Sequence, residues 1–259
     1  KERLFGLSNP QGNHGEDVKE YYFYLDATPT HSYLKYLYKY PQAAYPYEDL
    51  VTTNGQRSRQ ESEYELLDTG IFDENRYFDI FVEYAQVAPE DILIRINAIN
   101  RGPETADLRL LPTLWFRNTW SWQAGSAKPH LYQEENRSSY QVIRASHHEL
   151  GDYQLYCAEA PALLFCENET NAWRLFRSNN KGLYTKDGID DYIVHGKTNA
   201  INPANSGTKV AADYAFTIPP GESRQIQLRL CKADSIKADT VFTDFDKHID
   251  QRKKEADHF

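Results

Sequence analysis

The sequence predicts a mainly β protein, an antiparallel sandwich or barrel that ends in a helix. Short runs of alternating apolar and polar residues recur along the chain, with turn residues between them. Helical periodicity is confined to the last 20 or so residues. The runs do not alternate with helices, which argues against a parallel α/β sheet. A length of 259 residues allows one large domain or two small ones.

The clearest strands lie in the first half of the chain. In residues 77–85 the side chains of Phe78, Ile80, Val82 and Tyr84 share one face. Residues 91–100 alternate in the same way, and the turn residues 100–103 follow them. We therefore expect residues 108–116 to return as the partner strand of 91–100.

Further strands are expected at shorter spacing. Residues 20–26 alternate, whereas 27–50 contain Pro41 and Pro46 and are expected to be mostly loop with one short helix or strand. The polar residues 54–63 predict a surface loop. A hairpin is expected around the turn 219–221. The remaining predicted strands are 139–145, 153–158, 163–167, 208–216 and 223–230.

A helix is predicted from about Ala238, because Phe242, Phe245 and Ile249 recur at helical spacing. Its sequence is highly charged after Ile249 and lacks a stop signal, so we expect it to be poorly anchored to the sandwich. We therefore expect two parts in the chain: residues 1–235 form a β-sandwich N-terminal domain, and residues 236–259 form a helical linker. The chain contains no Met, and it looks like a piece of a longer protein.

Composition narrows the class of protein. A net charge of −9 argues against a nucleic-acid partner, since phosphate binding needs a basic face. No apolar run approaches the length of a membrane helix, and no signal peptide opens the chain. The odd cysteine count, with no metal-ligand spacing, predicts reduced structural thiols at Cys157, Cys166 and Cys231. We expect a cytoplasmic protein.

The stretch from Gly12 to Tyr47 stands out, because it holds 9 of the 19 tyrosines, together with His14 and His31. Tyrosine offers a flat apolar ring and a hydroxyl that needs a partner. Such a surface suits sugars, which present flat faces and hydroxyl groups. Tyrosine is also enriched at protein interfaces, so the same stretch can be a buried contact with another domain. Both interpretations remain open.

The sequence gives little sign of catalytic or metal chemistry. The adjacent carboxylates Glu16-Asp17, Asp73-Glu74 and Asp190-Asp191 are the candidates for an acid–base pair, and most such pairs are solvated surface. His147 and His148 would point to opposite faces of a strand. No GxSxG, GxGxxG or phosphate loop occurs, so no metal and no cofactor is expected.

A second aromatic cluster, LWFRNTWSW, follows the predicted central strands. Here Trp115 is expected in the core, whereas Trp120 and Trp122 stand beside polar residues and are expected to be more exposed. Loops on a rigid sandwich commonly carry binding residues. We therefore expect this loop to contribute to a binding site.

Five runs of the sequence resemble one known family. They are KERLFGLSNPQGNHGEDVKEYYFYLD, TPTHSYLKYLYKYPQAAYPY, YELLDTGIFDENRYFDIFVEYA, LRLLPTLWFRNTWSW and KDGIDDYIVHG. They resemble the N-terminal region of bacterial glucosidase-like proteins related to glycoside hydrolase family 63, the mannosyl-oligosaccharide glucosidases. The resemblance implies a β-supersandwich followed by an (α/α)6 catalytic barrel of an inverting hydrolase. It implies that the catalytic carboxylates lie in that barrel, beyond this chain.

We therefore expect a non-catalytic β-sandwich domain of an α-glucosidase-like glycoside hydrolase, inactive alone, that supports the barrel and the rim of its sugar site. A free-standing carbohydrate-binding module and the N-terminal domain of a sugar phosphorylase are the alternatives. The expected partners are an oligosaccharide or glucoside and the catalytic barrel, without nucleic acid or membrane. The expected sugar-binding residues are Glu16, Asp17, Lys19, Tyr21, His31, Trp120 and Trp122.

Overall fold

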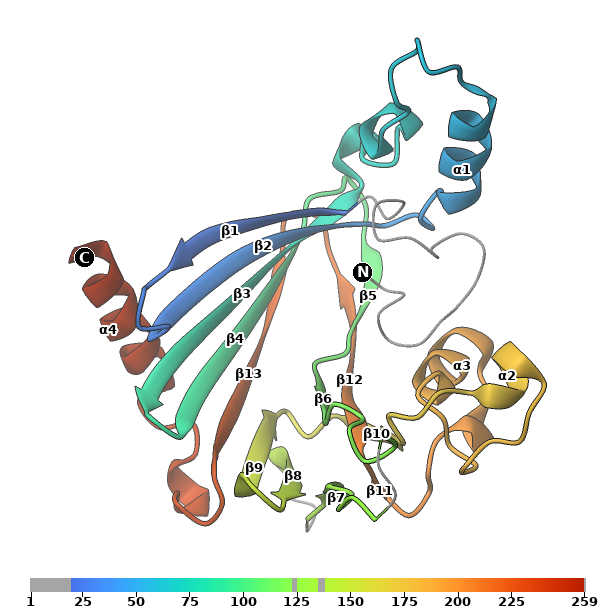
Figure 1. Cartoon of the computed structure of the whole chain (residues 1–259). Coiled ribbons are helices and arrows are strands. Elements are labelled where there is room, and N and C mark those ends of the chain that lie inside the picture. The colour runs from blue at the N-terminus through green and yellow to red at the C-terminus, as the bar shows by residue number, and fades with distance from the viewer. Residues whose placement is uncertain (1–19, 123–124, 135–137, 259) are drawn as a thin grey trace.

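The computed structural model describes residues 20–122, 125–134 and 138–258, and it confirms a mainly β, antiparallel sandwich (Figure 1). A nine-stranded sheet faces a smaller, four-stranded one. In spatial order the large sheet contains β1 (Tyr21–Ala27), β2 (Tyr33–Pro41), β3 (Tyr77–Ala88), β4 (Asp91–Asn100), β13 (Ser223–Lys232), β9 (Gly151–Ala158), β8 (Tyr140–His147), β7 (His130–Gln133) and β11 (Ser206–Gly207). The small sheet contains β10 (Ala162–Cys166), β12 (Lys209–Ile218), β5 (Ala106–Leu110) and β6 (Thr113–Trp115).

The helices lie on the two outer faces and at one end of the sandwich (Figure 1). The helices are α1 (Tyr47–Gln56), α2 (Ala172–Phe176), α3 (Gly188–His195) and α4 (Phe245–His258). Single 3-10 turns occur at Leu66–Thr69, Asp73–Asn75, Thr198–Ala200 and Ala238–Thr240. In Figure 1, α4 lies against the large sheet, and α2 and α3 form a lobe beside the small one. That lobe is held by Ile189, which packs on Leu164 and Ala211 of the small sheet.

The core lies between the two sheets, and strand alternation builds it as predicted. Phe78, Ile80 and Val82 of β3 are all buried in one cluster, to which β13 contributes Ile226 and Leu228. The same cluster takes Phe165 and Tyr214 from the small sheet. Since these side chains recur every second residue, burial of one face of each strand fixes its register.

Two of the predicted strand pairings are wrong, although the strands themselves form. Strand β4 pairs with β3 and β13, whereas the chain after it, in β5 and β6, pairs with β12 in the other sheet. Likewise β12 and β13 do not form the predicted hairpin, because each belongs to a different sheet. At both turns the chain crosses from one layer of the sandwich to the other.

The buried side chain of Asn100 stands where these crossings meet. Its amide nitrogen donates to the carbonyl oxygens of Glu104 at 2.7 Å and Ile218 at 2.8 Å. Its amide oxygen accepts from the backbone N–H of Gly102 at 2.8 Å and from the amide of Gln42 at 2.6 Å. The amide thus joins the end of β4 to the end of β12, in place of the ladder bonds that the crossing interrupts.

The prediction that the segment 27–50 is mostly loop is wrong. The segment forms the nine-residue strand β2, paired along its length with β3, and the start of α1. The alternation of lysine and tyrosine in LKYLYKY favours a strand, and pairing inside a large sheet overrides the two prolines, which fall at the end of β2 and just before α1.

The expectation that the C-terminal helix is poorly anchored is also wrong. Phe245 and Ile249 are buried against Tyr33, Ala85 and Leu93 on the outer face of the large sheet. The helix begins at Phe245, after a 3-10 turn at 238–240, so the predicted start at Ala238 is early. Most of the charged residues after Ile249 are exposed, whereas Arg252 faces the sheet, where its Nε donates to the carbonyl oxygen of Gln86 at 2.6 Å. The three cysteines are buried and unpaired, as predicted.

A buried carboxylate lies beneath this helix and gives a pH-dependent prediction. Glu83 accepts hydrogen bonds from the hydroxyl of Tyr33 at 2.6 Å and from Nε of Arg95 at 2.8 Å. Burial raises its pKa, but these two bonds and the positive charges of Arg95 and Lys35 together outweigh burial, so the pKa of Glu83 is lowered. A carboxyl group with a lowered folded-state pKa stabilises the fold above its ordinary pKa, near 4.3, and that contribution is lost as the pH falls.

We therefore expect Glu83→Gln to lower the free energy of unfolding by about 2 kcal/mol at pH 7, because Arg95 loses its charged partner. The difference from the unmodified protein should shrink as the pH falls from the ordinary carboxyl pKa, near 4.3, through the lowered pKa of Glu83. Urea unfolding at pH 7 and pH 3.5 measures both values. Glu149→Gln, at an exposed glutamate, is the control. An effect of Glu83→Gln that does not change with pH would contradict this assignment.

Candidate functional site

A face rich in tyrosine covers one end of the large sheet, on the side that carries the core. Strand pairing places Tyr22 and Tyr24 of β1 opposite Tyr38 and Tyr36 of β2, which share a face with Ile80 and Val82 of β3. Tyr40 follows on the same face of β2, opposite Phe78. We call Tyr22, Tyr24, Tyr36, Tyr38 and Tyr40 the tyrosine face.

Exposure increases along the tyrosine face from the core to the sheet edge. Tyr36 and Tyr38 are half-buried and pack against the main core cluster. Tyr40 is 40% exposed, Tyr22 52% and Tyr24 81%. The large sheet has more strands than the small one, so its β1–β2 end extends past the facing layer (Figure 1). Tyr36 and Tyr38 are therefore partly covered by the sandwich's own core, whereas Tyr22, Tyr24 and Tyr40 are exposed.

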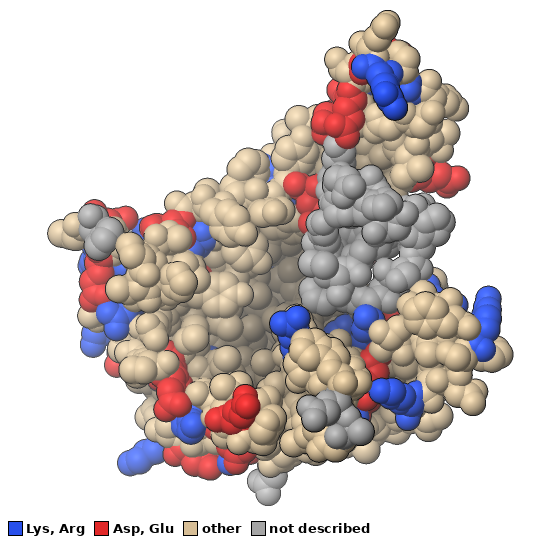
Figure 2. Space-filling model, in the orientation of Figure 1, with Lys and Arg blue, Asp and Glu red and all other residues tan. Residues whose placement is uncertain are grey.

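The rings on this face contact one another edge to face or tilted. Tyr22 and Tyr24 have their ring centroids 5.8 Å apart in a T-shaped arrangement, and Tyr38 and Tyr40 lie 6.0 Å apart. The hydroxyl oxygens of Tyr38 and Tyr45 are 3.5 Å apart. Figure 2 shows a hollow beside the inner side of β1 to β4, with few charged side chains on that wall.

Protonation keeps these hydroxyls in the form that can donate hydrogen bonds. Burial, and then the neighbouring Tyr84 and Tyr24, raise the pKa of Tyr36 to about 12. Burial and the contact with Tyr45 raise the pKa of Tyr38 as well. At neutral pH both phenols are therefore un-ionised, and each can donate one proton and accept another.

The residues predicted to bind sugar are not gathered at one site. Tyr21 points to the other face of β1, where its ring meets Phe72 edge to face at 5.8 Å. His31 lies in the exposed turn between β1 and β2. Glu16, Asp17 and Lys19 lie outside the described residues. Tyr22 and Tyr24 were missed as site residues, although alternation in EYYFYLD separates them from Tyr21.

The tryptophan loop lies after β6, in the other sheet. Trp122 is 67% exposed, as predicted, and the guanidinium of Arg117 lies 5.1 Å from its ring centre. Trp120 is half-buried, and its indole N–H donates to Glu169 at 3.0 Å. The expectation that Trp115 is a core residue is wrong. It is the last residue of the short strand β6 and is 47% exposed.

Two carboxylates meet under this loop, but a lysine holds both of them. Nζ of Lys128 lies 3.0 Å from Glu167 and 3.5 Å from Glu169. Glu167 also accepts a hydrogen bond from the hydroxyl of Thr208 at 2.7 Å. Glu169 holds the loop through the indole of Trp120, and Glu167 is held by Lys128 and Thr208. The cluster therefore presents Trp122 on a rigid support.

The adjacent carboxylates are likewise engaged in local structure. Glu74 forms an ion pair with Arg76 at 2.9 Å, and Asp191 forms one with Lys197 at 2.9 Å. Oxygen atoms of Asp190 and Asp191 and a ring nitrogen of His195 lie within 4.8 Å of one another. Such a set has the ligand types for a divalent cation, but the pairing of Asp191 with lysine weakens it as a metal site.

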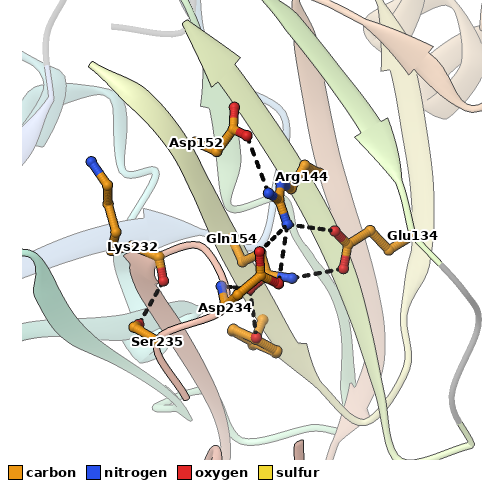
Figure 3. Close-up of polar contacts among 8 residues, drawn as sticks. Glu134, Arg144, Asp152, Gln154, Lys232, Asp234 and Ser235 are labelled. Atoms are coloured by element: carbon orange, nitrogen blue, oxygen red, sulfur yellow. Dashed lines mark hydrogen bonds and ion pairs between the residues drawn. The ribbon is translucent and has the colours of Figure 1, made fainter. Parts of the chain in front are cut away.

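A larger polar network, which the sequence did not predict, surrounds Arg144 of β8 (Figure 3). Its guanidinium lies 3.3 Å from Glu134 and 3.1 Å from both Asp152 and Asp234. Gln154 donates to Glu134 at 2.7 Å and accepts from the backbone N–H of Asp234 at 2.9 Å. Because every carboxylate faces the arginine, the network ties the segment after β13 to β8 and β9.

The tyrosine face brings three exposed aromatic rings, those of Tyr22, Tyr24 and Tyr40, to one end of the large sheet. Its exposed rings offer flat apolar area, and the hydroxyl groups at their rims can donate or accept hydrogen bonds. A ligand with a flat face and several hydroxyl groups matches both properties. In the part of the chain that the structure describes, no helix is long and apolar enough to span a membrane.

The fold defines the chain as a two-layer antiparallel β protein, and sequence comparison then relates it to a particular protein. It is 39% identical, over 299 aligned positions, to the uncharacterized protein YMR196W of Saccharomyces cerevisiae. The match takes in all of this chain, which spans 28% of the length of the yeast protein. No family model matches the chain, so the resemblance to glycoside hydrolase family 63 stays a prediction.

Solved structures give more distant similarity. A polysaccharide lyase, BACCELL_00875, is 10% identical with a TM-score of 0.41, over 83% of this chain and 23% of the lyase chain. A galactose mutarotase related enzyme from Lactobacillus acidophilus is 9% identical with a TM-score of 0.34, over 83% of this chain and 73% of that one.

Proposed function

We propose that this chain is a non-catalytic, carbohydrate-binding β-sandwich domain, and that the tyrosine face is its sugar-binding surface. The observation that carries the proposal is the exposure of Tyr22, Tyr24 and Tyr40 on the side of the sheet that forms the core elsewhere. Apolar residues on that side would be covered in an ordinary sandwich. Here the three tyrosine rings lie past the edge of the small sheet, which leaves them exposed to a ligand.

The chemistry of the face favours a neutral sugar. A saccharide stacks its C–H face on an aromatic ring and uses its hydroxyl groups at the ring's rim. The inner side of β1 to β4 carries few charged side chains (Figure 2), which suits an uncharged ligand better than an acidic one. The resemblance to family 63 supports an α-glucoside as the sugar.

The proposal extends to the longer protein. By that resemblance, this domain belongs to an inverting glycoside hydrolase whose acid and base carboxylates lie in a separate helical barrel. The unpaired cysteines support the further proposal that the protein is cytoplasmic. The domain would position the sugar chain at the rim of the active site, because a reactant held in the right orientation reaches the transition state with a smaller loss of entropy. The carboxylates described above are engaged in ion pairs and hydrogen bonds, which fits a non-catalytic role.

Titration with maltooligosaccharides of increasing length, followed by tyrosine fluorescence and calorimetry, tests the binding. We expect saturable binding that the double variant Tyr22→Ala/Tyr24→Ala weakens by about tenfold or more, since each lost ring contact is worth roughly 0.5–1.5 kcal/mol. The bound oligosaccharide should be recovered intact.

Phe23→Ala is the matched control, because Phe23 lies between the two tyrosines on the same strand, points to the opposite face and is 43% exposed. It should leave the affinity for the oligosaccharide unchanged. Equal losses in the two variants would place binding elsewhere or show a general effect on β1. Absence of saturable binding by the unmodified chain, across a panel of neutral oligosaccharides, would reject the sugar-binding function.

A further inference from the structure

A compact lobe formed by residues 171–197, on the outer side of the small sheet, carries four exposed large apolar side chains. The exposed fractions are 58% for Trp173, 70% for Phe176, 88% for Leu183 and 65% for Val194. The helix α2, which supplies the first two, has no buried residue at all. Large apolar side chains gathered in this way on one lobe usually mark an interaction site.

The lobe is held rigid by a buried carboxylate, so these side chains are presented in a fixed arrangement. Asp187 accepts a hydrogen bond from Thr185 at 2.6 Å, another from Asn171 at 3.1 Å and a third from Arg174 at 3.2 Å. Asn171 in turn caps α2 by accepting from the N–H of Arg174 at 3.0 Å. A five-residue helix is not stable alone. Polar contacts therefore hold a helix whose apolar side chains face outward.

The charge of the lobe differs in sign from that of the chain. Residues 171–197 contain five Lys and Arg and three Asp, a net charge of +2, in a protein whose net charge is −9. Two of the three aspartates face basic partners inside the lobe, Asp187 with Arg174 and Asp191 with Lys197. Arg177 and Lys181 are exposed, next to Phe176 and near Leu183 in the sequence. The apolar side chains are thus accompanied by positive charge.

We propose that this lobe is a docking surface for a protein partner that presents an apolar centre surrounded by carboxylates. The aliphatic side chains of Leu183 and Val194 give a sugar neither a ring to stack on nor a group to hydrogen-bond, whereas a protein partner buries them favourably. Complementary charge at the rim of an interface gives orientation and specificity. The fixed lobe also spares part of the ordering cost of binding.

Two designed helical peptides of 14 residues, with identical Leu and Trp positions and either Glu or Lys elsewhere, test the proposal on the folded chain. We expect the Glu peptide to bind at least tenfold more tightly than the Lys peptide in fluorescence anisotropy. General attraction to a chain of charge −9 would favour the Lys peptide, so this preference can arise only from a local basic surface.

Substitutions locate the site. Phe176→Ser and Leu183→Ser should each weaken binding of the Glu peptide at least fivefold. The double variant Arg177→Glu/Lys181→Glu should reverse the preference. Leu150→Ser, at a leucine that is 59% exposed in the turn between β8 and β9, should change nothing. All these side chains are exposed, so far-ultraviolet circular dichroism should show an unchanged fold.

Three results would overturn the proposal: equal affinity for both peptides, no measurable binding of either, or binding unaffected by Phe176→Ser and Leu183→Ser. Sedimentation velocity adds a fourth. A dimer of the unmodified chain that Phe176→Ser abolishes would mean that a second copy, and not an acidic partner, occupies the surface.

Discussion

Asn100→Ala should lower the free energy of unfolding by about 4 kcal/mol, one of the two largest effects we expect in this chain. The substitution removes one amide and leaves four groups without their partner: the carbonyl oxygens of Glu104 and Ile218, the N–H of Gly102 and the amide of Gln42. The Asn100 side chain is fully buried, whereas its contacts with Glu104 and Gln42 are only partly buried. Each group left without its partner costs about 1–3 kcal/mol, and least where water can replace that partner.

Urea unfolding followed by fluorescence measures this loss, with Asn199→Ala, at an exposed residue of the 3-10 turn 198–200, as the control. We expect the control to remain within about 0.5 kcal/mol of the unmodified protein. A loss of less than 1 kcal/mol for Asn100→Ala would mean that the amide does not join the two layers. Asn100→Asp should also be destabilising, because a carboxylate cannot donate to the two carbonyl oxygens.

The strands of this fold could be predicted from the sequence because alternation is a local signal. In β3 and β4 the period-two pattern identifies both the strand and its buried face. The strand β2 shows the limit of that signal. Its tyrosines and lysines alternate, but its face is only half-buried, and the burial that stabilises it comes from β3, some 40 residues further along the chain.

The assignment of strands to the two sheets could not be predicted, because a turn sequence does not show where the chain goes next. Residues 100–103 and 219–221 have ordinary turn composition, yet at each the chain passes to the other layer. What distinguishes the first crossing is the buried Asn100. Its side chain hydrogen-bonds Ile218, which lies 118 residues further along the chain. Long-range contacts of this kind leave no periodic pattern.

The candidate site was predicted in part. Composition located the tyrosine-rich stretch, and alternation could have assigned Tyr22 and Tyr24, rather than Tyr21, to the face shared with the core. Exposure could not be predicted, because it depends on the small sheet being narrower than the large one. The network around Arg144 joins residues from four separate segments, so no local motif indicates it.

Gly207→Ala should be similarly damaging, with a loss of about 3 kcal/mol or more. Gly207 ends β11 at the edge of the large sheet, and the chain then crosses to β12 in the small one. A Cβ atom at this position would lie 2.3 Å from the carbonyl oxygen of Cys166, far inside van der Waals contact. That oxygen also accepts the N–H of Thr208 at 3.1 Å, so moving it away breaks the bond that starts β12.

The glycine at 207 is needed for the close approach of two backbones and not for an unusual backbone angle, since it does not have a positive φ. Gly182→Ala is the matched control: it has no neighbouring atom within 4 Å, and we expect a change of less than about 0.5 kcal/mol. Thermal unfolding should show a fall in Tm of roughly 10 °C for Gly207→Ala, at 2–4 °C for each kcal/mol in a protein of this size. If the two alanine variants unfold at the same temperature, β11 and β12 are not held together at this point, and the crossing must tolerate a shift of the Cys166 carbonyl.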